Sequence, residues 1–192
     1  LVYNRLTDFY FEAPAQRVLK RAHDAQLAVV SPAPEHHASY ADKRNLGLLA
    51  PACLAAFGAS TEQIAALADV PQTMTVTQAA ADQLWAERKG LFFKPHAGFG
   101  SRAVYRGSKL TRKVWQQMLG ANYLAQPLVE PGRRALPSEQ QAVSGESRPL
   151  KFDVRLYTYR GEALLTTARL YRGQTTNFRT AGGGFAPVVR LP

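Results

Sequence analysis

The chain has 192 residues, of which 46% are hydrophobic, and a net charge of +10 from 24 basic and 14 acidic residues. This composition excludes a disordered chain, and the single cysteine, Cys53, excludes an internal disulfide and a multi-cysteine zinc site. The longest apolar run, near 46–57, is too short to span a bilayer, so we expect a cytoplasmic protein that makes no membrane contact. Because the chain begins at Leu1 without an initiator methionine, we expect upstream residues to be missing.

Residues 1–90 are predicted to be rich in helices, with isolated short strands. Helical spacing and cap signals predict helices at 13–26, at 41–57 with a break at Pro51, from a cap at Thr61, and at 77–88 with Thr77 as its cap. Short strands are expected at 27–30 and 74–76. The two histidines of a proline-rich segment, His36 and His37, are expected to be solvated loop residues rather than metal ligands.

From Leu91 the strand content rises, which predicts a mostly antiparallel sheet and an α+β fold class. The expected strands are 91–94, 103–106, 123–129, 150–159 and 163–171, with one helix near 112–119. The polar segment 131–149 is rich in proline, glycine and serine, and it is predicted to be a mobile excursion within one lobe.

The segment 91–107 combines an apolar strand with a glycine-punctuated loop and a second strand. Gly98 and Gly100 allow backbone N–H groups to approach an anion, while Lys94 supplies a charge and Ser101 a hydroxyl donor. The lysine precedes the glycines, so this is neither a P-loop nor a dinucleotide-binding fingerprint. The segment predicts a hairpin that holds a polyphosphate, although an ordinary tight turn has the same pattern.

The strand at 150–159 alternates in character. Phe152, Val154 and Leu156 are predicted to face the core, whereas Asp153, Arg155 and Tyr157 form a charged face. Taken alone, the charged pair fits a surface ion pair equally well.

The register with the following strand decides whether Arg169 joins that charged face. A two-residue turn at 160–161 would place Arg169 opposite Phe152, and a three-residue turn at 160–162 would place it opposite Asp153. We predict the second arrangement, because an arginine directed into the core would be unfavourable.

The segment 173–185 contains two threonines, Asn177 and Arg179, followed by the glycines 182–184. Adjacent glycines indicate either a flexible hinge or backbone that lies against a ligand, and the preceding polar residues favour the ligand.

Five stretches together resemble the ATP-grasp superfamily, and more narrowly a bacterial group of ATP-grasp-like proteins. They are ADKRNL at 41–46 with VPQT at 70–73, FFKPHAGFGS at 92–101, YLAQPLVE at 123–130, LKFDVRLYTY at 150–159 and ARLYRGQTTNFRTAGGG at 168–184. The last two are similar to strands and loops of tubulin-tyrosine ligases, glutathione synthetases and ribosomal-protein glutamate ligases.

The resemblance implies two lobes with mostly antiparallel sheets that enclose a nucleotide cleft. Residues 1–40 would belong to a preceding domain and 41–192 to the ATP-grasp-like region. In the implied site, Lys43 and Lys94 would contact the α- and β-phosphates, and the loop with Gly98, Gly100 and Ser101 would close over the β- and γ-phosphates. Gln126, Val129 and Glu130 would line the adenine and ribose. Arg155 and Arg169 would neutralise the γ-phosphate and the acyl phosphate, and Asn177 would lie beside the acceptor.

Magnesium is the second cofactor that the resemblance implies, beside ATP. ATP-grasp enzymes hold it with carboxylates that lie beyond these motifs, but this chain has no carboxylate after Glu162. The ligand candidates that remain are Glu130, Asp153 and Asn177, of which Asp153 and Asn177 fit best.

The leading hypothesis is an ATP-dependent carboxylate-amine ligase that acts through an acyl phosphate on an acceptor that is possibly acidic. A nucleotide-binding protein of the same fold without ligase turnover is the alternative. A basic nucleic-acid-binding module is a hypothesis from another class, less favoured because it leaves the glycine loops unexplained.

Overall fold

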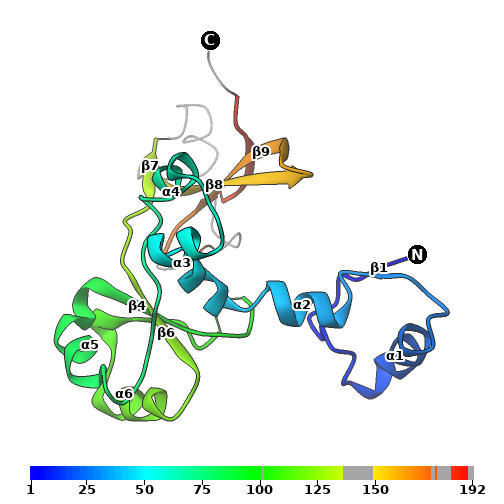
Figure 1. Ribbon diagram of the computed structural model, residues 1–192, viewed down its shortest axis with the longest axis horizontal. Coiled ribbons are helices and arrows are strands. Elements are labelled where there is room, and N and C mark those ends of the chain that lie inside the picture. Colours follow the sequence, from blue (N-terminus) through cyan, green and yellow to red (C-terminus); the bar gives the residue numbers. More distant parts are fainter. Residues whose placement is uncertain (101, 136–148, 174–175, 177–182, 190–192) are drawn as a thin grey trace. The chain divides into compact units, whose positions relative to one another are not determined.

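The computed structural model describes residues 1–100, 102–135, 149–173, 176 and 183–189. The chain forms two compact units, Leu1–Leu128 and Val129–Pro192. Both contain antiparallel sheets, and unit 1 adds helices and one parallel strand pair, which confirms the α+β fold class (Figure 1). Among the described residues, none of the helices combines the length and the apolar character that crossing a membrane requires.

Unit 1 begins with a small parallel pair, β1 (Val2–Tyr3) and β2 (Val30–Ser31). The 3-10 helix η1 (Pro14–Gln16) and helix α1 (Arg17–Asp24) connect the two strands, close to the predicted helix. Helix α2 (Pro34–Tyr40) follows, so the loop predicted for His36 and His37 is wrong. A proline at the first helical position starts this helix, because its fixed φ suits that turn.

The next segment consists of three short helices: η2 (Lys43–Leu49), α3 (Pro51–Ala56) and α4 (Thr61–Ala66). The predicted break at Pro51 is confirmed, since Ala50 has an extended backbone and Pro51 starts a new helix. Thr61, however, is not the cap of α4. Ser60 takes that role, and it forms a capping box in which its side chain and that of Gln63 each bind the other's backbone N–H.

The main sheet of unit 1 has the order β3 (Met74–Thr75), β6 (Tyr123–Pro127), β4 (Leu91–Pro95) and β5 (Tyr105–Arg106), all antiparallel. The predicted hairpin around the glycine loop is therefore confirmed as the pair β4–β5. Two helices accompany the sheet, α5 (Ala81–Glu87) and α6 (Arg112–Leu119), together with two 3-10 turns, η3 (Arg88–Gly90) and η4 (Gly107–Lys109). Thr77 accepts a hydrogen bond from Ala80 N, in a turn that precedes α5.

The core of unit 1 lies between one face of this sheet and helices α5 and α6. Its buried side chains include Leu84, Leu91, Phe93, Trp115 and Met118. Because side chains alternate along a strand, β4 directs Leu91 and Phe93 into this core and Lys94 to the opposite face. The core thus fixes the strand that presents the lysine.

Unit 2 is a four-stranded antiparallel sheet with the order β10 (Gly184–Pro187), β9 (Glu162–Tyr171), β8 (Leu150–Tyr159) and β7 (Gly132–Arg134). Part of the predicted excursion 131–149 is therefore a strand, β7, and its stretch 136–148 lies outside the described residues. Ser101, Asn177 and Gly182 also lie outside them.

The register between β8 and β9 pairs Asp153 with Arg169, as predicted, but the predicted turn is wrong. The turn has two residues, Arg160 and Gly161, both with positive φ (51° and 84°). A register shift beyond it leaves Leu164 without a partner on β8. This β-bulge adds the one residue that a longer turn was expected to supply.

The predicted core face of β8 is largely open. Val154 is 53% exposed and Leu156 is 61% exposed, and only Phe152 of the three is half-buried. The predicted core contact of Val154 and Leu156 is therefore wrong, because within unit 2 no described helix covers this side of the sheet.

Candidate functional site

A hydrogen-bonded chain crosses the open face of the unit 1 sheet. Lys94 Nζ donates to Gln126 Oε1 at 2.6 Å, and Gln126 Nε2 donates to Thr73 Oγ1 at 2.7 Å. The register places Gln126 opposite Phe92, two residues before Lys94 on the same face, which explains why the two side chains meet. Since the Gln126 oxygen accepts only one of the three lysine protons, Lys94 can donate to a further acceptor.

Lys43, at the start of η2, is a second cation close to Lys94. Burial and the positive charge of Lys43 both lower the pKa of Lys94, and burial also lowers the pKa of Lys43. Among the described residues, neither lysine forms an ion pair with a carboxylate. Two partly desolvated cations that repel each other are the charge pattern of an anion site.

The glycine loop lies beside these lysines. Lys43 Nζ donates to Gly98 O at 3.1 Å, and Lys43 N donates to His96 O at 2.9 Å. Gly98 has φ +115° and Gly100 has φ +62°, values that residues with side chains rarely adopt. The loop is thus attached to η2 by both the backbone and the side chain of Lys43.

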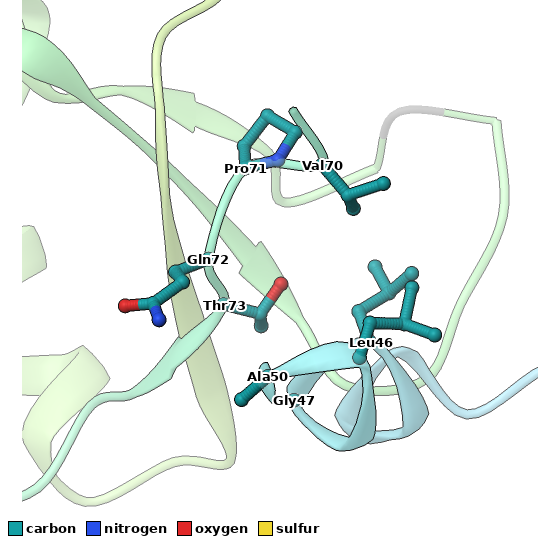
Figure 2. A pocket seen from close by; sticks show the side chains of 8 residues that line it. Leu46, Gly47, Ala50, Val70, Pro71, Gln72 and Thr73 are labelled. Atoms are coloured by element: carbon teal, nitrogen blue, oxygen red, sulfur yellow. The ribbon is translucent and has the colours of Figure 1, made fainter. Parts of the chain in front are cut away.

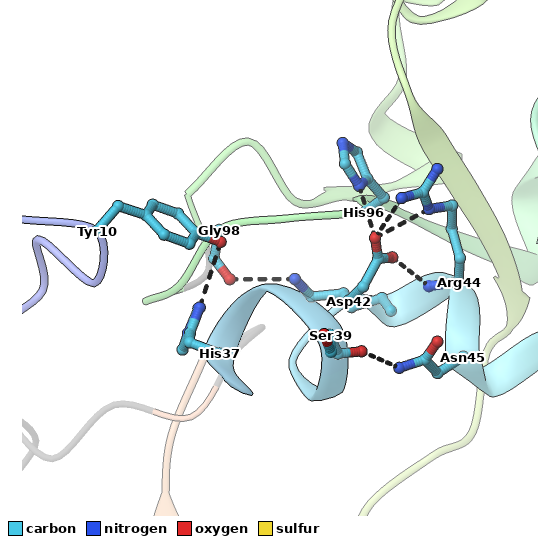
Figure 3. Close-up of polar contacts among 9 residues, drawn as sticks. Tyr10, His37, Ser39, Asp42, Arg44, Asn45, His96 and Gly98 are labelled. Carbon is cyan, nitrogen blue, oxygen red and sulfur yellow. Dashed lines mark hydrogen bonds and ion pairs between the residues drawn. The ribbon is translucent and has the colours of Figure 1, made fainter. Parts of the chain in front are cut away.

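An ionic group that the sequence reasoning missed holds η2 in place (Figure 3). Asp42 caps η2 by accepting from Arg44 N at 2.8 Å, and its Oδ2 lies 2.6 Å from the Arg44 guanidinium and 3.2 Å from His96 Nδ1. These contacts hold the pKa of Asp42 well below its usual value. The sequence feature that could have pointed to Asp42 and His96 is their position beside the two lysines, because Asp42 precedes Lys43 and His96 follows Lys94 by two residues.

Aromatic residues pack against the same loop from the N-terminal part of unit 1. Phe99 makes an edge contact with Phe9 at 5.4 Å, and Phe9 stacks on His37 at 3.7 Å. Burial and the charge of Lys43 lower the pKa of His37, which places this half-buried histidine in the field of the site. Sequence reasoning assigned His37 to solvent because it could not anticipate the stacking with Phe9.

A small open hollow adjoins the lysine chain (Figure 2). Its volume is about 110 Å³, and it is lined by η2 and the segment 70–73, including Leu46, Pro71 and Thr73. Thr73 also accepts from Gln126, so the hollow and the Lys94 chain share a wall. A space of this size holds a few water molecules rather than a whole nucleotide.

Two of the predicted catalytic residues, Arg155 and Arg169, lie on one face of the unit 2 sheet, and the third, Asn177, lies outside the described residues. Arg169 Nε donates to Asp153 Oδ1 at 2.6 Å, and Thr176 Oγ1 donates to Asp153 Oδ2 at 3.1 Å. Arg155 lies on the same face, with its guanidinium 5.9 Å and 6.0 Å from the ring centroids of Tyr157 and Phe185. Asp153 therefore orients Arg169, while aromatic rings flank Arg155.

The fit of magnesium to Asp153 is poor. Both of its oxygens already accept hydrogen bonds, one of them from an arginine. In the described part of the chain, no group of three or more His, Cys, Asp or Glu side chains could hold a metal ion. The other candidate, Asn177, lies outside the described residues.

The structure brings some of the predicted binding residues together in unit 1, and two others belong to unit 2. One cluster in unit 1 contains Lys43, Lys94, Gly98 and Gln126. Gln126, which was predicted to line the adenine, accepts a hydrogen bond from Lys94 instead. Val129, 64% exposed, and the exposed Glu130 begin unit 2. The boundary between the units falls inside the stretch 123–130.

No model of a known protein family matches the sequence, and the curated proteins contain no significant match to it.

Proposed function

We propose that the chain is an ATP-dependent carboxylate-amine ligase of the ATP-grasp type, which acts through an acyl phosphate. Unit 1 binds the phosphates of the nucleotide with Lys94, Lys43 and the glycine loop. The acceptor is a carboxylate on an acidic molecule, and the attacking group is an amine or a related nucleophile.

The observation that supports this proposal most strongly is the pair of lysines in unit 1. Two cations stand close enough for Lys43 to lower the pKa of Lys94, and burial lowers the pKa of both. The charge of Asp42 acts on Lys43 in the opposite direction, but among the described residues neither lysine forms an ion pair with a carboxylate. A polyphosphate would relieve their repulsion and supply the missing counter-charge, and loop N–H groups near Gly98 and Gly100 could add donors. Lys94 Nζ keeps protons for it, because Gln126 is the one acceptor of Lys94 within the described part of the chain.

The arginine face of unit 2 would serve the phosphoryl transfer, the first step of the reaction. In acyl phosphate formation, a carboxylate oxygen attacks the γ-phosphorus, the bond to the bridging oxygen breaks, and ADP leaves. An amine then attacks the acyl carbon, phosphate leaves, and the amine gives up a proton to solvent. Arg155 and Arg169 would neutralise the transferring phosphoryl group, since phosphoryl transfer depends mainly on positioning and charge neutralisation.

Nucleotide binding without turnover is the second candidate function. It is favoured by the ion pair of Asp153 with Arg169, which occupies the best described carboxylate for a metal-bound nucleotide.

Phosphate release from ATP, measured with panels of carboxylic acids and amines and with and without magnesium, tests the proposal. We expect phosphate release to require both an acid and an amine. We also expect Arg155→Lys to reduce this release strongly. ATP binding without release in any combination would favour the second candidate. A chain that binds no nucleotide would overturn both.

A further inference from the structure

A compact basic cluster lies on the helical side of unit 1, away from the lysine chain. It consists of five residues at the ends of η3, η4 and α6 that we call the basic cluster: Arg88, Lys89, Lys109, Arg112 and Lys113. Its centre is Trp85, because the guanidinium carbons of Arg88 and Arg112 lie 3.9 Å and 4.0 Å from its ring centroid. Two arginines from different elements thus share one indole.

The backbone around the cluster is tightly fixed. Arg88 Nη1 donates to Trp85 O at 2.7 Å, and a Cβ added to Gly107 would stand 1.8 Å from Arg88 O. Only a glycine at 107 therefore lets η4 pack directly on η3. Trp85 also packs against Trp115 of the core, with 5.8 Å between ring centroids. The two arginines are consequently placed by the core of unit 1 rather than by a free loop.

The cluster has an excess of charge that nothing described compensates. Lys89, Lys109, Arg112 and Lys113 are exposed. Within the described part of the chain, none of the five cluster residues forms an ion pair with a carboxylate. The nearest acidic residue in sequence, Glu87, accepts instead from Gln83. Such a concentration of like charge, with two planar guanidiniums held in place, is suited to an anionic partner.

We propose that the basic cluster binds an acidic polypeptide segment through side-chain carboxylates. Arginine forks held against an aromatic ring lose little entropy when they bind carboxylates in pairs, and the three lysines add charge around them. Two of its cations share one indole and the three lysines lie beside them in sequence or on the adjoining turn η4, which matches a short run of Glu or Asp residues.

A nucleic acid fits the cluster less well. Single strands bind largely by stacking bases on exposed aromatic rings, and the ring of Trp85 is already in contact with two guanidiniums. Duplexes are bound through extended rows of phosphate contacts, and this cluster is confined to the ends of neighbouring elements.

The proposal does not depend on the proposed ligase function. β4 directs Phe93 toward this side of the sheet and Lys94 toward the other, so the cluster and the lysine chain use opposite faces. A change in one is not expected to alter ligand binding at the other.

The test uses the full chain and a short, labelled, glutamate-rich peptide, whose binding is followed by fluorescence anisotropy. The chain has two tryptophans, Trp85 and Trp115, so a change in tryptophan emission on binding reports contact near the cluster. Lys109→Glu/Lys113→Glu is expected to weaken peptide binding about tenfold or more. The matched control, Arg17→Glu/Arg21→Glu, reverses two exposed charges on α1 and is expected to leave binding within about twofold.

The conservative variant Arg112→Lys keeps the charge but removes the planar fork, and it is expected to weaken binding about threefold. Equal weakening by the α1 control would show that net charge alone attracts the peptide, and it would overturn the proposal. Tighter binding of an oligonucleotide of the same formal charge, lost in Lys109→Glu/Lys113→Glu, would assign the cluster to phosphates instead. We expect ATP binding to stay unchanged in Lys109→Glu/Lys113→Glu. A loss of peptide binding in this variant would then concern the basic cluster alone and not the proposed nucleotide site.

Discussion

Gly107→Ala is the substitution whose effect the packing of unit 1 determines most directly. The new Cβ would stand 1.8 Å from Arg88 O, 2.7 Å from Arg88 C and 2.9 Å from Phe93 Cε2. The first two obstacles are backbone atoms, which cannot rotate away as a side-chain tip can. η3 and η4 must therefore move apart, and the fully buried Phe93 must shift in the core as well.

Overpacking of this kind costs typically about 1–3 kcal/mol, and because backbone is involved we expect the upper end, about 3 kcal/mol. At about 2–4 °C per kcal/mol, the melting temperature should fall by roughly 6–12 °C. Gly120→Ala is the matched control, since Gly120 has φ −94° and no atom within 4 Å of its added Cβ. Thermal unfolding followed by circular dichroism measures both. A Gly107→Ala protein as stable as the control would refute the packing of η4 against η3.

Three further predictions concern pH and the hairpin. The contacts with Arg44 lower the pKa of Asp42 from 3.8, so Asp42 stabilises the fold above pH 3.8 and this contribution disappears as the pH falls through the lowered pKa. Asp42→Asn keeps a good N-cap residue but removes the ion pair with Arg44, so it should lower the stability at pH 7 by up to about 1 kcal/mol and approach the wild type in strong acid. Urea titrations that give the same difference from the wild type at every pH would contradict this. Burial lowers the pKa of Lys94 in the folded state below its ordinary value of 10.5, so the folded protein loses this proton at a lower pH than the unfolded chain does. The free energy of unfolding should therefore rise as the pH increases from the lowered pKa to 10.5. Lys94→Met should lack that gain, which the difference between the two pH–stability profiles measures; a constant difference across the alkaline range would argue against a desolvated lysine. In the β8–β9 turn, both Arg160 and Gly161 have positive φ, a conformation that glycine adopts without strain and residues with a Cβ do not. Gly161→Ala should therefore destabilise unit 2 by about 1 kcal/mol, whereas Arg160→Gly should not destabilise it. Equal effects of the two substitutions in chemical unfolding would contradict this turn.

Strong local patterns made much of the fold predictable from sequence. The helix at 112–119 and the strand at 150–159 have the predicted bounds, since clear periodicity and a threonine cap mark them. The hairpin around the glycine loop was predictable because glycines separate two apolar strands. The start of helix α4 was predicted one residue too late. Ser60 rather than Thr61 caps it, because a capping box places its second residue, Gln63, three positions after the cap.

The errors arose where contacts over long sequence distances decide the outcome. The register of Asp153 with Arg169 was predicted correctly for the wrong reason, since a bulge at Leu164 replaces the longer turn. Alternation could not show that the face with Val154 and Leu156 stays open within unit 2. In the candidate site, Lys94 was named from the pattern of strand and glycine loop, and Lys43 from the resemblance. The roles of Asp42 and His96 depend on packing between η2 and the end of β4.

The central claim is that the lysine pair of unit 1 binds the phosphates of a nucleotide. Isothermal titration of a non-hydrolysable ATP analogue into the wild type, Lys94→Met and the exposed control Lys113→Met tests it most directly. Loss of one charge-assisted hydrogen bond costs about 1.5–3 kcal/mol, so Lys94→Met should raise Kd roughly 10- to 150-fold, while Lys113→Met should leave it unchanged. Equal affinity in all three proteins, or no binding by the wild type, would contradict the account.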